Sequence, residues 1–368
     1  MLRFRLPLLA ALTFGSMTLA GCDAFSKDDD GPAVTGVYVA NQGNFGDGNG
    51  SVSTYDPETN AATPAAITGL GSIVQSVLVH EGRLYLTANT GGRVDVFDAA
   101  TLARVGQVAG LVSPRYLAVA RGKLYVTNLY ASAGTFSGGT VSVVDLATLA
   151  KVKDITVGDN PEGIAVAGDR VFVANHGFGA GRTLSVIDAR TDAVVLTVDA
   201  GCDGPRSLFV DGEGELVALC TGNTLYDANF NVAGRTNGAL RVLDPATGTV
   251  RARLDLPAQA GAAGAGQDGF FSRETDELFF VSGPNVRRFR TDTHALAADA
   301  ATVTNGSPGA VAFDAARGDL YVGLLPASNA YTTAGAVDVF RLGAGAFAKR
   351  ATFAAGVAPT FILFREGR

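Results

Sequence analysis

One short hydrophobic pattern recurs seven times along the chain. Each copy has four positions: an apolar residue, an aromatic or apolar residue, a second apolar residue and then a small or polar residue, as in Val37 to Ala40. The copies begin at Val37, Leu84, Leu124, Val171, Leu216, Leu278 and Leu320. Short apolar runs rich in β-branched and aromatic residues and bounded by turn residues predict β-strands. A regular recurrence of such strands predicts a repeat architecture.

Further strands complete a unit of four around each copy. An inner strand, opened by a turn with Pro or Gly, precedes copies two to seven, and an outer strand such as Ala150 to Val157 closes the unit. The strands expected directly after the copies are Ser51 to Asp56, Arg93 to Asp98, Thr140 to Asp145, Thr183 to Asp188, Ala239 to Asp244, Asn285 to Arg290 and Ala336 to Arg341. Four strands make one blade of a β-propeller.

The first copy lacks an inner strand, and the C-terminal segment Ala358 to Phe364 supplies one. A strand from the far end of the chain would complete the first blade and remove the open edge of the ring. The sequence therefore predicts an all-β fold over residues 34–368. We expect a seven-bladed β-propeller of four-stranded blades, closed by the C-terminal strand. An open solenoid would instead need terminal caps.

The N-terminus has the features of an export signal. Arg3 and Arg5 precede an apolar run from Leu8 to Ala20, which is shorter than the roughly 20 residues of a membrane span. Leu19 to Cys22 then reads Leu-Ala-Gly-Cys, which resembles the lipobox of bacterial lipoproteins. We expect residues 1–21 to be a signal peptide and residues 22–33 to be a lipidated Cys22 and its tether, so that lipid alone holds the protein to a membrane. An ordinary secretory signal with a chance cysteine is the alternative.

Composition and motifs limit which classes of partner and which kinds of chemistry the chain is expected to have. A formal net charge of −6 disfavours nucleic acid as a partner, and the absence of Trp weakens any sugar-stacking role. Cys202 and Cys220 lie near the ends of two successive strands, which predicts a disulfide, with two free buried thiols as the alternative. We find no motif of a nucleophile elbow, a zinc protease or a phosphate loop. We therefore expect no enzyme activity, no metal site and no cofactor.

The copies ending in Asn41, Asn128 and Asn175 read YVAN, YVTN and FVAN, and they resemble the YVTN, or YncE-like, propeller family. The opening from Val37 to Thr59 and the segment around the two cysteines resemble a lipoprotein subfamily of the Bacteroidetes. Its BtuG-type members capture cobalamin on a TonB-dependent transporter, whereas other members have no known ligand. Gln42 stands where Glu is expected, a mild departure.

Two sorting signals next to Cys22 conflict. Ser26 to Asp30 resembles the acidic signal that sends Bacteroidetes lipoproteins to the cell surface. Asp23 would retain a lipoprotein at the inner membrane under enterobacterial rules. We expect an outer-membrane lipoprotein exposed at the cell surface, with a periplasm-facing one as the alternative.

The candidate site lies on one face of the ring, where the longest loops meet the starts of the inner strands. The turns of the opposite face are short and are expected to offer little. A concave face with aromatic walls and a few polar groups suits a ligand. The candidate ligand contacts are Asn44, Phe45, Gln75, Arg115, Tyr116, Tyr130, Glu162, His176, Phe178, Arg206, Tyr226, Asp268 and Tyr331.

These residues also have plainer interpretations. Loop Asn residues form turns, loop Phe residues pack on their own blades, and Arg115 and Arg206 bond neighbouring loops. His176 is expected to be a solvated loop residue rather than a cobalt ligand.

The leading hypothesis is therefore capture of a small ligand, with cobalamin as the most specific candidate, for a TonB-dependent transporter. A structural or protein-interaction propeller is the alternative. A metal-dependent hydrolase that uses Glu162, Asp268 and Asn175 is a remote one.

Overall fold

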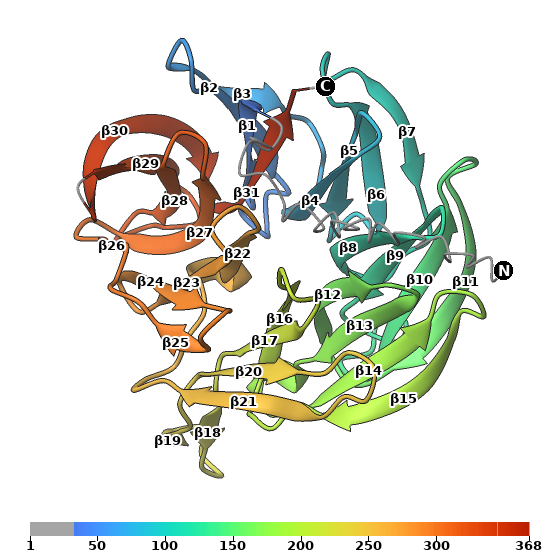
Figure 1. Ribbon diagram of the computed structural model, residues 1–368. Helices are drawn as coiled ribbons and strands as arrows, with labels where there is room; N and C mark the ends of the chain where they lie inside the picture. The colour runs from blue at the N-terminus through green and yellow to red at the C-terminus, as the bar shows by residue number, and fades with distance from the viewer. Residues whose placement is uncertain (1–32, 344, 368) are drawn as a thin grey trace, which may run out of the picture. The chain divides into compact units, whose positions relative to one another are not determined.

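The repeated strand pattern folds into seven sheets arranged around a common axis (Figure 1). The computed structural model describes residues 33–343 and 345–367. The first three blades use β1 (Val34–Asn41), β2 (Ser51–Asp56), β3 (Ala61–Ile67), β4 (Val74–His80), β5 (Arg83–Ala88), β6 (Arg93–Asp98), β7 (Arg104–Val108), β8 (Pro114–Ala120), β9 (Lys123–Asn128), β10 (Gly139–Asp145) and β11 (Ala150–Val157).

The fourth and fifth blades use β12 (Pro161–Ala167), β13 (Arg170–Asn175), η1 (Gly177–Gly179), β14 (Thr183–Asp188), β15 (Ala193–Asp199), β16 (Pro205–Val210), β17 (Leu216–Cys220), β18 (Thr224–Tyr226), β19 (Val232–Arg235), β20 (Ala239–Leu243) and β21 (Val250–Asp255). The rest of the chain forms η2 (Ala263–Ala265), β22 (Gly269–Ser272), β23 (Glu277–Ser282), β24 (Asn285–Arg290), β25 (Ala295–Leu296), β26 (Ala301–Thr302), β27 (Ser307–Asp314), β28 (Asp319–Leu325), β29 (Ala334–Gly343), β30 (Ala346–Val357) and β31 (Pro359–Glu366). The predicted all-β, seven-bladed propeller is confirmed.

The ring closes as the sequence predicts. The last strand, β31, pairs antiparallel with β1, with Val37 opposite Phe364 and Ala40 opposite Phe361. The first blade therefore has the order β3-β2-β1-β31 and joins both ends of the described chain. Figure 1 shows the red β31 beside the blue β1.

The aromatic residue of the repeat pattern holds neighbouring blades together. Tyr85, Tyr125, Phe172, Phe279 and Tyr321 are at most 1% exposed. Burying such a side chain contributes about 1.5–3 kcal/mol. The hydroxyl of Tyr125 also donates to Asp192 Oδ1 of the next blade at 2.6 Å. An aromatic ring with a polar tip can thus fill the space between two blades and bond the far one.

The Asn that ends the motif braces the strand that follows it. Asn128 Nδ2 donates to Thr140 Oγ1 at 3.0 Å and to Ser142 Oγ at 2.8 Å, while its Oδ1 accepts from Val112 N at 3.3 Å. Asn175 makes the equivalent bonds to Thr183 and Ser185 at 3.0 Å each. Because these amides are buried and fully bonded, the motif residue has a structural role.

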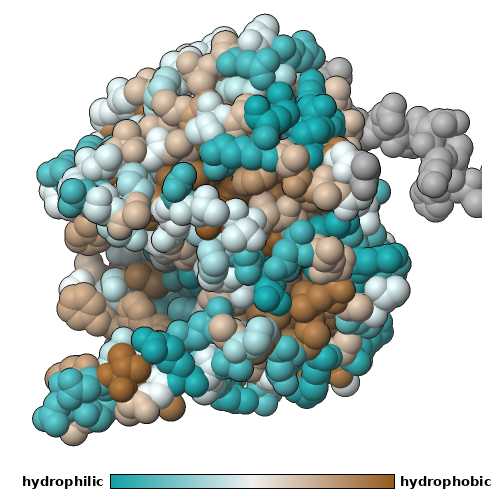
Figure 2. Space-filling view, turned by 90° about the vertical axis from the view of Figure 1, so that its left-hand side faces the viewer, coloured by the Kyte–Doolittle hydropathy of each residue, from teal (hydrophilic) through white to brown (hydrophobic). Residues whose placement is uncertain are grey.

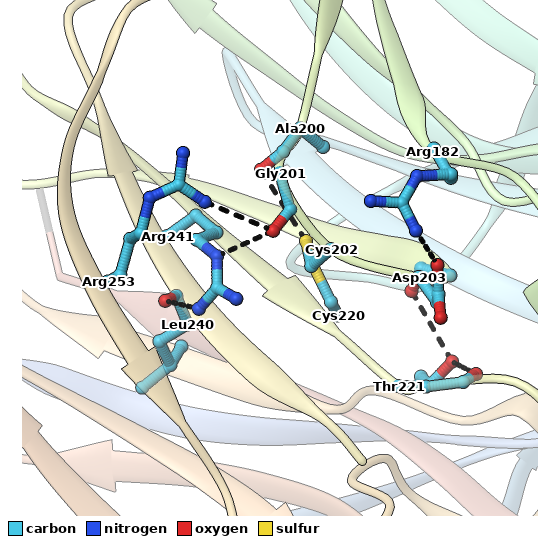
Figure 3. The surroundings of a disulfide bond; sticks show 12 residues. Arg182, Ala200, Gly201, Cys202, Asp203, Cys220, Thr221, Leu240, Arg241 and Arg253 are labelled. Atoms are coloured by element: carbon cyan, nitrogen blue, oxygen red, sulfur yellow. Dashed lines mark hydrogen bonds and ion pairs between the residues drawn. A yellow bond between two sulfur atoms is a disulfide. The ribbon is translucent and has the colours of Figure 1, made fainter. Parts of the chain in front are cut away.

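A disulfide joins Cys202 and Cys220, as predicted (Figure 3). Their Cα atoms lie 6.2 Å apart, and the two positions are 18 apart in the sequence. Arg241 Nε donates to the carbonyl of Gly201 beside the bond at 2.9 Å. The disulfide therefore fixes the strand start at Pro205 to the end of β17.

Two expectations for the chain need qualification. The segment Thr221 to Gly238, expected to be a loop, contains the antiparallel hairpin of β18 and β19. The predicted signal peptide, Cys22 and the tether up to residue 32 lie outside the described residues. Among the residues that are described, no helix is long and apolar enough to cross a membrane.

Candidate functional site

In several blades, an irregularity in the pairing of the inner strand directs one side chain toward the axis of the ring. In blades 2 to 5 the pairing of the inner strand with its neighbour shifts register after the first residue of the inner strand. The shift follows Val74 in blade 2, Pro114 in blade 3, Pro161 in blade 4 and Pro205 in blade 5. A β-bulge re-aims the side chains that it contains. The residues in these bulges include Gln75, Arg115, Glu162 and Arg206. Four of the candidate contacts therefore occupy one repeated position.

The Thr of the repeat motif stabilises the bulge in two blades. Thr127 Oγ1 accepts from Tyr116 N at 3.0 Å and donates to the carbonyl of Glu162 in the next blade at 2.9 Å. Thr87 Oγ1 accepts in the same way from Ser76 N at 2.8 Å. The hydroxyl thus satisfies a backbone N–H that the strand ladder leaves unpaired.

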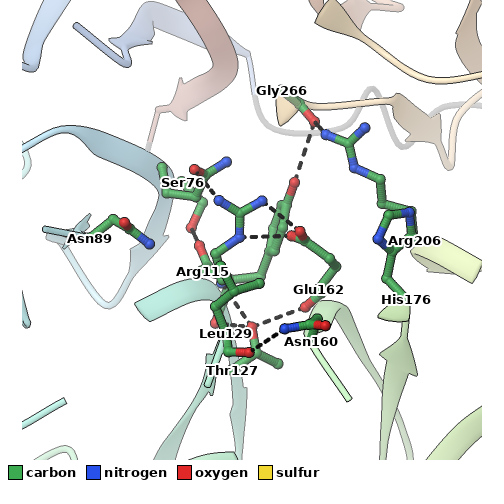
Figure 4. Close-up of polar contacts among 12 residues, drawn as sticks. Ser76, Asn89, Arg115, Thr127, Leu129, Asn160, Glu162, His176, Arg206 and Gly266 are labelled. Carbon is green, nitrogen blue, oxygen red and sulfur yellow. Dashed lines mark hydrogen bonds and ion pairs between the residues drawn. The ribbon is translucent and has the colours of Figure 1, made fainter. Parts of the chain in front are cut away.

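Arg115 and Glu162 form a bidentate ion pair near the axis (Figure 4). Arg115 Nε and Nη2 donate to the two carboxylate oxygens of Glu162 at 2.8 and 2.6 Å, and Nη1 donates to Gln75 Oε1. All three side chains are buried. Burial alone would raise the pKa of Glu162, but Arg115 and Arg206 outweigh it and leave this pKa below its usual value.

Arg206 and Asp268 form a second buried ion pair. Arg206 Nη1 lies 3.3 Å from Asp268 Oδ1. That carboxylate also accepts from Ser207 Oγ at 2.7 Å and from Ala262 N at 2.9 Å. As the plainer interpretation expected, Arg115 and Arg206 bond groups of neighbouring blades.

An Ala- and Gly-rich segment, residues 257–267, covers the axis between these pairs. The carbonyl of Gly266 accepts from Tyr116 of blade 3 and from Arg206 of blade 5, each at 3.3 Å. Gln267 N donates to the carbonyl of Thr360 in blade 1 at 2.7 Å. A Cβ on Gly266 would lie 1.9 Å from the carbonyl oxygen of Gly309, so only glycine fits there.

Two candidate residues lie deeper than a solvated loop would place them. Burial raises the pKa of Tyr116 to about 12, and the centroid of its ring lies 6.5 Å from that of Phe361 in blade 1. Burial lowers the pKa of His176 to about 4, and His176 Nε2 is 3.2 Å from Thr221 Oγ1. His176 is thus partly buried and bonded to blade 5, rather than fully solvated as expected.

The remaining candidates lie in the loops around this centre. Asn44 is a turn former, since its Oδ1 accepts from Gly46 N at 2.7 Å and from Asp47 N at 3.2 Å. Tyr130 is partly exposed. The exposed aromatic side chains of these loops are Phe45 (73%), Phe136 (78%), Phe178 (61%), Tyr226 (60%), Phe230 (87%) and Tyr331 (41%). These rings are not packed on their own blades as the plainer interpretation expected. Phe136 and Phe230 are absent from the candidate contacts above.

The loops that carry these rings hold few charges. Residues 129–138 and 324–335 contain no Asp, Glu, Lys or Arg, and neither does the Ala- and Gly-rich segment 257–267. The loop from Gln42 to Gly50 has one charge, Asp47, the loop of Phe178 has one, Arg182, and residues 221–238 have two, Asp227 and Arg235. Charge depletion together with aromatic side chains is typical of a binding surface rather than of a solvated one.

The opposite face carries clefts that the sequence did not lead us to expect. A cavity of about 610 Å³ lies between blades 1 and 2 and is lined by His80, Asp98 and Arg365, among others. Another of about 660 Å³ lies between blades 4 and 5 beside Arg170 and Asp188. Short turns leave gaps where neighbouring blades diverge. The expectation that this face offers little to a ligand stays a prediction.

The residues from 35 to 364 match the family model described as Domain of unknown function (DUF5074). The chain belongs to this family. No curated protein matches this DUF5074 chain. A chain of the hydrazine synthase of Kuenenia stuttgartiensis is similar to it in structure, with a TM-score of 0.61 and 20% identity over 78% of this chain and 88% of that one. At this identity the likeness shows the propeller fold alone.

Within the described part of the chain, no group of three or more His, Cys, Asp or Glu side chains is placed to hold a metal ion. The carboxylates of Glu162 and Asp268 are instead bonded to arginines. The geometry is that of a firmly bonded floor surrounded by exposed rings, an arrangement suited to binding.

Proposed function

We propose that this DUF5074 propeller is a non-enzymatic binding protein that captures an uncharged small ligand on its loop face. One observation carries the proposal: exposed aromatic side chains stand on nearly charge-free loops around a floor whose buried charges are already paired. Such a floor has no free charge to offer a strongly ionic ligand. Rings and amides can contact a large neutral one.

Cobalamin is the ligand to test first. It is a large molecule whose corrin ring is edged with neutral amides, which matches a face of rings and amides. The resemblance of the first blade to cobalamin-capturing lipoproteins supports the same choice. We further propose that the protein is an outer-membrane lipoprotein at the cell surface, anchored through Cys22, that hands its ligand to a TonB-dependent transporter.

Isothermal titration of the soluble chain from Gly31 with cyanocobalamin tests this proposal. We expect one-to-one binding, and we expect the triple variant Phe45→Ala, Tyr130→Ala and Phe178→Ala to weaken it at least tenfold, a loss of about 1.4 kcal/mol.

The matched control replaces Val105, Val152 and Val195 by alanine, because these side chains are 54–58% exposed on outer strands. Binding should be unchanged in this control. No heat and no thermal stabilisation of the wild-type chain would exclude cobalamin as the ligand.

The hairpin of β18 and β19 favours a second candidate function, interaction with a protein. The two strands pair only with each other among the described strands, and the hairpin exposes Leu225, Phe230 and Val232. It stands out from the body at the lower left of Figure 2. Replacing residues 224–235 by a short turn should abolish capture of a protein partner in envelope cross-linking. Unchanged cross-linking would exclude this role for the hairpin.

A further inference from the structure

We infer that Tyr130, Phe136 and Phe178 form a stacking subsite for a flat, uncharged ring of the ligand. The inference rests on the proposed function and places one chemical group of the ligand on blades 3 and 4. Tyr130 and Phe136 come from the loop between β9 and β10, and Phe178 comes from the loop between β13 and β14.

The three rings form one cluster. The centroids of Tyr130 and Phe136 lie 5.5 Å apart with the rings nearly perpendicular, and those of Tyr130 and Phe178 lie 6.5 Å apart at 47°. These are attractive ring geometries. Tyr130 is partly exposed, whereas Phe136 and Phe178 are mostly exposed. The cluster therefore offers ring faces and edges to a ligand rather than filling the core.

Phe178 is held in this position against a backbone preference. Its φ of 54° and ψ of 33° lie in the left-handed region, which an aromatic residue rarely adopts. Three backbone bonds fix the loop around it: His176 O accepts from Gly179 N and Gly181 N at 2.9 Å each, and Gly177 O accepts from Ala180 N at 3.1 Å. Strain kept by such bonding, with the side chain left exposed, points to a use for the ring in binding.

One residue connects the two loops. Asp159 Oδ1 accepts from Gly138 N at 2.8 Å, and its carbonyl accepts from Gly177 N at 3.0 Å. The rings are thus positioned before a ligand arrives, which lowers the entropic cost of binding.

A flat neutral ring suits this cluster better than the other groups that an aromatic cluster attracts. The loop of residues 129–138 has no charged side chain, and Arg182 in the loop of Phe178 is paired with Asp203. The nearby carboxylate of Asp159 is exposed to water and bonded to Gly138 N. A cation would therefore gain little beyond contact with the rings. A saturated ring would lack the quadrupole that favours edge-to-face and offset stacking.

Saturation-transfer NMR of the soluble chain with three separate probes tests this inference without knowledge of the natural ligand. The probes are benzimidazole as a flat ring, cyclohexanol as a saturated ring and choline as a cation. We expect the strongest transfer to benzimidazole. We expect the triple variant Tyr130→Ala, Phe136→Ala and Phe178→Ala to weaken its binding about three- to tenfold.

Two further variants make the result specific. Tyr130→Phe keeps a ring and should retain benzimidazole binding. The triple variant Val105→Ala, Val152→Ala and Val195→Ala removes exposed apolar side chains from outer strands and should leave it unchanged. All substitutions are at exposed or partly exposed positions, and an unchanged melting temperature verifies the fold.

The outcomes separate this inference from the proposed function. Equal benzimidazole transfer in the wild-type chain and the triple alanine variant would overturn the subsite, even if cyanocobalamin binds. A choline or cyclohexanol signal that matches or exceeds that of benzimidazole would also overturn it. Loss of benzimidazole transfer in a chain that does not bind cyanocobalamin would confirm the subsite and exclude only that ligand.

Discussion

Breaking the Arg115–Glu162 pair tests whether the axis is held together by its internal charges. Glu162→Gln keeps the size of the side chain but removes its charge, and it leaves a buried guanidinium with no anion at 2.6 Å. Removing one partner of a buried ion pair costs about 3–5 kcal/mol. With an unfolding entropy of about 0.7 kcal/mol/K for roughly 330 residues, the melting temperature should fall by about 4–7 °C.

The coupling between the two residues separates pairing from loss of packing. Arg115→Met should cost a similar amount, and the double variant should cost little more than either single one. This leaves an interaction free energy of about 2 kcal/mol or more in urea unfolding. The control pair Arg121 and Asp169 has the same chemistry at 2.9 Å, but each side chain is about half exposed. Its coupling should be about 0–1 kcal/mol.

His176 provides an independent measure of the charge on Glu162. The pKa of His176 is lowered mainly by burial, while the negative charge of Glu162 opposes that shift. Glu162→Gln should therefore move the pKa of His176 below about 4, and Arg115→Met should move it upward. An NMR titration of His176 in each variant measures both shifts. Additive unfolding costs with an unchanged His176 titration would refute the reasoning.

Three further predictions concern other buried polar groups. Burial raises the pKa of Asp211 to about 6, so ionisation of this carboxyl group destabilises the fold as the pH rises through that range. In urea unfolding, Asp211→Asn should therefore stabilise by up to about 3 kcal/mol at pH 7.5 but by only about 0.5 kcal/mol at pH 4. Because the pKa of His176 is lowered in the folded state, the unfolded state takes up its proton first as the pH falls. The free energy of unfolding should therefore fall between pH 6.5 and about 4, by at most about 1.4 kcal/mol per pH unit. His176→Gln should remove this slope. Asn128→Ala should lower the free energy of unfolding by about 2–3 kcal/mol in thermal unfolding, because two side-chain bonds to β10 are lost. Asn89→Ala is the control and should lower it by about 1 kcal/mol, because the Asn89 amide donates only to Pro114 O among the described contacts.

The sequence predicted the ring because its signals are periodic and local. Aromatic residues at one position of each copy, such as Tyr85 and Tyr125, mark strands buried between blades. The C-terminal strand could be assigned because the first blade lacked one. Pro followed by a polar residue, as at Arg115 and Arg206, also marked the strand starts that face the axis.

The missed features depend on contacts between distant parts of the chain. Residues 257–267 have neither apolar periodicity nor charge, and nothing local shows that Gly266 will meet blades 3 and 5. The burial of His176 depends on Thr221, 45 residues later. The hairpin of β18 and β19 consists of very short strands with exposed side chains, so it lacks the pattern of a core strand.

The division between floor and loops explains why the repeat says little about the ligand. In blades 2 to 5 the bulge commits one side chain to the axis, and these side chains bond one another or their neighbours. Replacing one of these side chains therefore destabilises the fold, so they are poorly suited to vary with the ligand. Rings in the loops, such as Phe136 and Phe178, have few native contacts to lose, so their replacement should alter binding at little cost to the fold. Two results together would demonstrate this division. Loop substitutions should abolish ligand binding without loss of stability, and axis substitutions should lower stability without loss of ligand binding.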